Sequence, residues 1–275
     1  MLRQREGRTA RPCRKAIRQY ILAIAVPVLL LLFPQTGHSI NPTVETIVRE
    51  IQRAEEARES ALRDMVYTAN TRVIEWEDVS RRTVKSETLS VRTVYVREPD
   101  EIRNEYLSMT VDGRKLSKKE MERELAKQQR GGRGDGNGEF QSPFSAEASA
   151  LYDFELRGPD RFEGQAVWAV EFTPKEPGEN LYNGTALVSR EDFQPVYVEI
   201  TPAELPRVLE EFAMSIRFAS VDGFQLPAVF SMDMRVRVSL LITLADRTLS
   251  IEDRYSDYSL NAGLSDDIFS DQSRY

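Results

Sequence analysis

Residues 218–242, FASVDGFQLPAVFSMDMRVRVSLLI, carry the clearest pattern of hydrophobic and polar positions in the chain. Asp222 and Gly223 lie between two apolar-rich runs, and this pair tolerates the positive φ angles of a tight type I′ hairpin turn. After the turn, apolar and mostly polar positions alternate with a period of two, the apolar ones being Phe230, Met232, Met234, Val236, Val238, Leu240 and Ile242. The pattern predicts an unusually long strand with one apolar face. Such a strand requires a large curved or twisted antiparallel sheet around it.

Residues 43–65 predict an amphipathic helix, with Asn41 as its cap and Pro42 at its first helical position. Apolar side chains recur in this segment at helical spacing, and Glu and Arg occupy the opposite face. From Val66 the spacing changes to that of strands, in the runs 66–76, 86–98 and 102–111. Turn residues separate these runs, so they predict an antiparallel meander. We expect the helix to pack its apolar stripe against this sheet.

Residues 115–143 interrupt the strand pattern. Ser117 caps a charged helical segment, and the glycine-rich stretch GGRGDGNGE follows it. We interpret this region as a mobile insertion between strands. Strand patterning then resumes in the runs 150–157 (a short strand or a helix end), 167–173, 185–189, 195–200 and 249–260. One or two helical turns are expected over 205–212. The sequence therefore predicts a single domain over residues 40–265 and a flexible polar tail over 266–275.

The first 39 residues have the layout of an export signal. Basic residues precede an uncharged apolar run at 21–33, ILAIAVPVLLLLF, and small residues lead to a possible cleavage point after Ser39. The apolar run is too short to span a bilayer comfortably, so we predict a secretory signal over residues 1–39, with an uncleaved anchor as the alternative. With either alternative, we expect the rest of the chain to be exported.

Without residues 1–39, the chain has 30 Lys and Arg against 43 Asp and Glu, a net charge of −13. This charge argues against nucleic acid and anionic membrane surfaces as general partners. The chain's one Cys, Cys13, and its one His, His38, both lie in the predicted signal. Catalytic sites that need either residue, and Cys/His zinc sites, are therefore excluded from the exported chain. We expect no metal, no cofactor and no enzymatic activity, although catalysis by carboxylates or Lys alone stays open.

Four short segments resemble a known family. They are FEGQAVW at 162–168, ALVSREDFQPVYV at 186–198, VDGFQLP at 221–227 and RYSDY at 254–258. In this order, after an export signal and a long helix, they resemble the periplasmic outer-membrane lipoprotein-sorting superfamily, the LolA/LolB-like carriers, over residues 43–262. The resemblance implies an α+β fold in which an antiparallel incomplete β-barrel wraps around helices. It also implies an apolar cavity that holds the acyl chains of lipoproteins as they cross the periplasm.

The resemblance suggests which residues line such a cavity. Methionine suits an irregular apolar wall, and the apolar face of the long strand is the candidate wall. The alternative is that these side chains pack solidly on the helices, and for Trp168 the choice is likewise between core and cavity lining. The candidate ligand-binding residues are Leu107, Met109, Trp168, Met232, Met234, Val236, Val238 and Leu240.

The implied ligands are lipids or lipoprotein acyl chains, and the implied partners are membrane-bound transport proteins. Two features depart from the family: the insertion has no counterpart, and no lipidated Cys follows the apolar run, which argues against an anchored receptor. A different class of function stays open, a periplasmic regulatory or sensor module that binds a protein. Arg235 and Arg237 share one strand face, where they either bind a carboxylate or pair with neighbouring strands.

Overall fold

The computed structural model describes residues 41–97, 101–131, 141–178, 180–239 and 243–270. The predicted export signal and Leu240 lie outside these ranges, and the chain from Asn41 onward forms one compact unit. Its helices are α1 (Val44–Ala61), α2 (Lys118–Gly131), the short 3₁₀ helix η1 (Ser149–Leu151) and α3 (Asp266–Ser270). Its strands are β1 (Asp64–Trp76), β2 (Val84–Arg97), β3 (Glu101–Val111), β4 (Arg114–Lys115), β5 (Tyr152–Phe162), β6 (Gln165–Pro174), β7 (Tyr182–Ser189), β8 (Pro195–Pro202), β9 (Leu209–Val221), β10 (Phe224–Ser239) and β11 (Thr243–Leu260).

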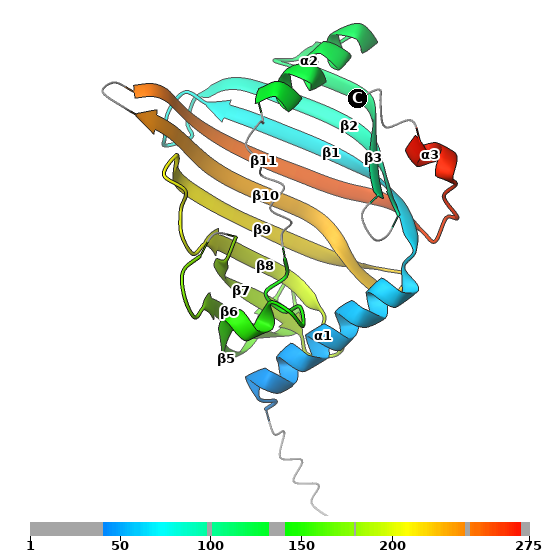
Figure 1. Ribbon diagram of the computed structural model, residues 1–275, viewed down its shortest axis with the longest axis vertical. Coiled ribbons are helices and arrows are strands. Elements are labelled where there is room, and N and C mark those ends of the chain that lie inside the picture. The colour runs from blue at the N-terminus through cyan, green and yellow to red at the C-terminus, as the bar shows by residue number, and fades with distance from the viewer. Residues whose placement is uncertain (1–40, 98–100, 132–140, 179, 240–242, 271–275) are drawn as a thin grey trace, which may run out of the picture. The chain divides into compact units, whose positions relative to one another are not determined.

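Across the described residues, eleven strands form one antiparallel sheet in the order β4-β3-β2-β1-β11-β10-β9-β8-β7-β6-β5 (Figure 1). Neighbours in the sheet are also neighbours in sequence at every step except one. That step pairs β1 with β11 from Met65↔Leu260 to Trp76↔Thr248 and joins two meanders in the middle of the sheet. The sheet ends in two edges, β4 and β5, so it is an open curved sheet rather than a closed barrel. The predicted fold class is confirmed.

The hairpin at Asp222 and Gly223 is also confirmed. Their φ angles are +49° and +86°, and Val221 pairs directly with Phe224 across the turn. Strand β10 is 16 residues long, as its alternation predicts. Its apolar side chains from Phe230 to Val238 lie on the face against which α1 packs, which we call the inner face.

The inner face is built from cross-strand rows of apolar side chains. One row runs from β5 to β10 through Leu156, Val170, Ala186, Val198, Ile216 and Phe230. Helix α1 buries Ile47, Val48 and Ile51 against the β5–β8 part of this face. Phe144 and Ala148, in the segment that leads to η1, complete this cluster. The main core therefore lies under α1, at the β5–β8 end of the inner face.

A second, smaller cluster lies at the opposite end of the inner face, on β3. Met121 and Leu125 of α2 pack on Met109 of β3 and bury it to 2 % exposure. In Figure 1, α1 and α2 both lie on the near side of the sheet, over its two opposite ends. The insertion that interrupts the strand pattern therefore contributes a helix that covers the sheet.

Several local expectations differ from the structure. Thr43 rather than Asn41 caps α1, and the backbone N–H of Thr46 donates to its Oγ1. Residues 205–212 are not helical. Strand β9 begins at Leu209, which pairs with Val236 of β10. The tail is not wholly frayed, because α3 buries Phe269 beneath the Arg97 guanidinium, 4.6 Å from the ring centroid. No helix among the described residues is both long and apolar enough to cross a bilayer.

Gly184 is needed where the Phe172 ring lies over β7. A Cβ added at this glycine would lie 2.2 Å from the Glu199 carbonyl oxygen and 2.5 Å from Phe172 Cζ. Neither neighbour can move freely, because one is backbone and the other is fully buried. The close approach of strand and ring therefore depends on the absence of a side chain.

We expect Gly184→Ala to lower the free energy of unfolding by about 1–3 kcal/mol, the usual effect of overpacking a core. Urea unfolding followed by tryptophan fluorescence measures this. Gly178→Ala is the control, because its added Cβ meets only the Leu181 side chain, at 3.3 Å. Equal stability of the two variants would contradict the role assigned to Gly184.

Candidate ligand-binding face

Between α1 and α2, the inner face carries a strip of half-buried apolar side chains. Met214 of β9, Met232 of β10, Ile251 of β11 and Val73 of β1 are successive cross-strand partners in it. The next row toward one end of the strands is Phe212, Met234 and Leu249. All of these side chains are half-buried. Met214 packs at the edge of the α1 core, and the rest of the strip extends beyond that core across the middle of the sheet.

A cavity of about 260 Å³ continues this strip beneath the second half of α1. Ile51 and Ala54 form its helical wall, Phe144 closes it, and Ile216 and Phe218 of β9 form part of its floor. The volume lies just below the range of about 300–1,000 Å³ that is usual for small-molecule sites. Together, the strip and the cavity form a mostly apolar surface on one face of the sheet, with Arg58, Gln194 and Gln225 as polar residues of the cavity lining.

One carboxyl group lies in the wall of this cavity. Glu55 of α1 accepts a hydrogen bond from the Ser142 hydroxyl at 3.0 Å. Burial raises the pKa of the Glu55 carboxyl above its usual value, and this effect exceeds those of the Ser142 hydrogen bond and the Arg58 charge, which both lower the pKa. Partial burial in the cavity wall therefore disfavours the ionised form of Glu55.

A polar cluster interrupts the inner face next to the apolar strip. The row that contains Phe230 continues through Asp253 of β11, Thr71 of β1 and Ser90 of β2. Arg92 donates to the Thr71 hydroxyl, which itself donates to the Asp253 carboxylate. Arg92 Nη2 lies 3.5 Å from Asp253 Oδ2, and their side chains are only 17 % and 12 % exposed. A largely buried ion pair therefore borders the apolar surface.

Three tyrosines lie beside this ion pair. The Tyr67 and Tyr255 rings meet edge to face with centroids 5.6 Å apart, and Tyr258 lies 5.0 Å from Tyr67. The Tyr255 hydroxyl donates to Asp253 at 3.2 Å. Burial is the main cause of a raised pKa at each of the three hydroxyls. The cluster is thus polar but sheltered from water.

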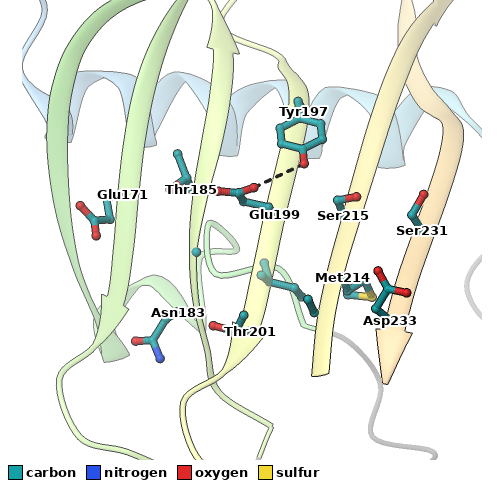
Figure 2. A pocket seen from close by; sticks show the side chains of 13 residues that line it. Glu171, Asn183, Thr185, Tyr197, Glu199, Thr201, Met214, Ser215, Ser231 and Asp233 are labelled. Atoms are coloured by element: carbon teal, nitrogen blue, oxygen red, sulfur yellow. Dashed lines mark hydrogen bonds between the residues drawn. The ribbon is translucent and has the colours of Figure 1, made fainter. Parts of the chain in front are cut away.

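The outer face of the sheet is different in character. Figure 2 views a depression of about 490 Å³ on this face, with α1 behind the sheet. Its labelled side chains include Glu171, Asn183, Thr185, Glu199, Thr201, Ser215, Ser231 and Asp233. Arg157 pairs with Glu171, and the Ser250 hydroxyl donates to Asp233 at 2.5 Å. Tyr197, Ile200 and Met214 also line this depression, which is therefore of mixed character and more polar than the cavity under α1.

Arg235 and Arg237 belong to the same outer surface. Arg235 makes two hydrogen bonds to Asp246, at 3.0 and 2.8 Å, and both arginines pair with Glu210. Their guanidinium groups therefore brace neighbouring strands. The described residues contain no group of three or more His, Cys, Asp and Glu side chains that could hold a metal ion.

The candidate residues from the sequence fall into three groups. Met232, Met234, Val236 and Val238 lie half-buried along the inner side of β10. Trp168 and Met109 lie in the two helix-covered clusters, Trp168 at 4 % exposure in the core under α1 with the Arg190 guanidinium over its ring. Leu107 is 58 % exposed, because the register of β2 and β3 shifts between Val91 and Arg92 and places it at a bulge. Their role in ligand binding stays a prediction.

The candidate residues chosen from the sequence do not include the β9 side of the strip. Phe212, Met214, Ile216 and Phe218 alternate with a period of two, which is a strand signal. The helical interpretation of 205–212 hid the start of this pattern. The sequence analysis also did not identify Arg92 and Asp253 as neighbours. They lie 161 residues apart in sequence and meet only through the pairing of β1 with β2 and β11.

The chain is similar to several solved structures at low sequence identity. The chain is similar to the crystal structure of a LolA superfamily protein from Nitrosomonas europaea, at 14 % identity and a TM-score of 0.40, over 83 % of this chain and 98 % of that chain. The chain is also similar to the crystal structure of a DUF1329 family protein from Desulfovibrio piger. The sequence identity is 14 % and the TM-score 0.43, and the match covers 84 % of this chain and 99 % of that chain. A third similar structure is a putative outer membrane lipoprotein-sorting protein domain from Vibrio parahaemolyticus. The sequence identity is 15 % and the TM-score 0.39, and the match covers 82 % of this chain and 97 % of that chain. Two of these solved structures, the LolA superfamily protein and the lipoprotein-sorting domain, are of the kind that the sequence resembles.

No curated protein matches the chain. A family model matches residues 42–248, which include α1 and the strands from β1 to β10. The chain therefore belongs to DUF5686, a family of unknown function.

Proposed function

We propose that this protein is a periplasmic carrier that binds the acyl chains of lipids or lipoproteins on the inner face of its sheet and transports them towards the outer membrane. The observation that supports this proposal is the apolar strip between α1 and α2, continued by the cavity under α1. A purely structural core would be filled by the protein's own side chains. Here the apolar rows extend beyond the area that the α1 core covers.

The physics of acyl-chain binding fits such a surface. Transfer of a methylene group from water to an apolar environment is favourable by about 0.8 kcal/mol, whatever the identity of the lipid. Half-buried methionines suit this task, because their flexible side chains adapt to chains of different shape. A carrier of this kind needs neither a catalytic group nor a metal, and the export signal expected at residues 1–39 supports a location outside the cytoplasm.

The direct experiment is native mass spectrometry, with lipid extraction, of the protein purified from a cell that exports it. We expect bound acyl species and uptake of a fluorescent long-chain acyl probe. A preparation that carries no acyl species and takes up no probe would overturn the proposal.

The two faces of β9 and β10 offer a matched pair of variants. Met214 and Met232 are cross-strand partners on the inner face, and Ser215 and Ser231 are the adjacent partners on the outer face. We expect the double variant Met214→Gln/Met232→Gln to bind the probe roughly tenfold or more weakly, because burying a methionine is worth about 1.5–3 kcal/mol and 1.4 kcal/mol is tenfold in affinity. Fluorescence titration measures the change.

The control is Ser215→Gln/Ser231→Gln, which adds the same amide groups to the same strands on the other side of the sheet. We expect its affinity to equal that of the wild type. Thermal unfolding of both variants shows whether they fold. Equal losses of affinity in the two double variants would show that the probe does not bind on the inner face.

Glu55 predicts how binding depends on pH. An acyl chain in the cavity removes further water from this carboxyl and raises its already raised pKa, so that binding takes up a proton. Affinity for an uncharged acyl probe is then lowest where Glu55 is ionised in both states, and it rises as the pH falls through the pKa of the complex. We expect tighter binding at about pH 5 than at about pH 8.

Glu55→Gln should remove this pH dependence and bind tightly across the range. Glu56→Gln, at the adjacent exposed position of α1, is the control and should keep the wild-type profile. A wild-type slope that survives in Glu55→Gln would exclude Glu55 as its source.

A further inference from the structure

The polar cluster on the inner face has more hydrogen-bond donors than the protein uses. An arginine carries five N–H groups. Three of those on Arg92 are directed to Asn104 at 3.1 Å, to Thr71 and to Asp253. Among the described residues, the other two N–H groups have no acceptor. The guanidinium is nevertheless only 17 % exposed at the side-chain level, so water has little access to these donors.

Two hydroxyl groups beside Arg92 add to this surplus. Ser90 is 7 % exposed and follows Thr71 in the inner row. Tyr67 lies on β1, close enough that the charges of Arg92 and Asp253 both act on its hydroxyl. Within the described part of the chain, neither hydroxyl has a hydrogen-bond partner. The acceptor side is nearly filled, because Asp253 already accepts from Thr71, Tyr255 and Arg92.

This imbalance defines the chemistry of a ligand. Unused donors grouped around a guanidinium complement an oxygen-rich anion, and arginine binds carboxylate and phosphate with two parallel hydrogen bonds. A cationic headgroup would meet unpaired N–H groups and a carboxylate that is already satisfied. The free positions therefore fit a phosphate or carboxylate group.

The position of the cluster relates it to the apolar strip. Asp253 and Ile216 lie two strand spacings apart, with Phe230 between them, which is about 10 Å. Ile216 forms part of the cavity floor under α1. One leaflet of a bilayer, the depth of an acyl chain, is about 15 Å thick. A chain whose head lies at Arg92 thus reaches the cavity by crossing Phe230.

We propose that the cluster around Arg92 is a headgroup site, which selects acyl lipids that carry an anionic phosphate or carboxylate head. The inference rests on the proposed carrier function and specifies its ligand. The Arg92 guanidinium and the Ser90 and Tyr67 hydroxyls bind the head. The acyl chain lies over Phe230 and ends under α1. Asp253 and Thr71 position the guanidinium.

Three single-chain probes of equal length test the site: hexadecyl phosphate, palmitate and hexadecanol, each below its aggregation concentration. We expect the wild type to bind the two anionic probes roughly tenfold or more tightly than the alcohol, the scale of a charge-assisted hydrogen bond. Arg92→Gln should lose this preference and keep its affinity for hexadecanol. Inorganic phosphate competes with the anionic probes if the site binds a free anion, and its failure to compete shows that the head is bound together with its chain.

Two further variants keep the test decisive. Arg72→Gln removes an arginine from the outer side of β1, where it pairs with Glu87 at 2.7 Å, and should keep the preference for anionic heads. If Arg92→Gln fails to fold because Asp253 is left unpaired, Arg92→Gln/Asp253→Asn removes both charges and should show the same loss. Equal binding of the three probes by the wild type, or an unchanged preference in the Arg92 variants, would overturn the headgroup site alone. Failure of the wild type to bind any probe would overturn the carrier function as well.

Discussion

A mismatch of size governs this structure: one helix cannot cover the sheet that it packs against. Helix α1 has 18 residues and is about 27 Å long. Eleven strands, at about 4.8 Å from one to the next, extend about 48 Å. The inner face of every strand from β5 to β10 is nevertheless apolar. Helix α1 covers the β5–β8 end and α2 covers Met109 at the other end, which leaves the strip over β9, β10, β11 and β1 between them.

The incomplete cover sets the energetic terms of binding. Ten methylene groups on the strip gain about 8 kcal/mol from burial. Association costs at least about 4 kcal/mol in lost motional freedom, so that the net affinity for a single chain is at most moderate. Moderate affinity suits a protein that must release what it binds. An enclosed cavity of the same lining would bind more tightly and release more slowly, because k_off carries most differences in affinity.

Local chemistry explains which features the sequence predicted. The Asp222–Gly223 turn, the alternation of β10 and the apolar stripe of α1 each depend on neighbouring residues, and each was found in the structure. Leu107 is exposed at a bulge where the register of β2 and β3 shifts by one residue, and no local pattern marks that bulge. Trp168 lies in the cluster under α1 and Met109 in the cluster under α2. The alternation of a strand predicts which face a side chain is on, but it does not predict which helix covers that face. The ion pair of Arg92 and Asp253 depends on the pairing of β1 with β11, which joins the two ends of the chain.

The two charged features of the inner face act in opposite senses. Burial under α1 raises the pKa of Glu55 and disfavours its ionised form, even with Arg58 in the same cavity wall. Arg92 has N–H groups left for an anion, at the other end of the same apolar path. A buried ion pair seldom stabilises a fold more than apolar residues of equal size would, so Arg92 and Asp253 are not explained by stability. They are explained if the ligand must lie in one direction, with its head at Arg92 and its tail beneath α1. The sheet would then determine orientation as well as affinity, and a carrier that presents every ligand in one direction can hand each of them to the same acceptor.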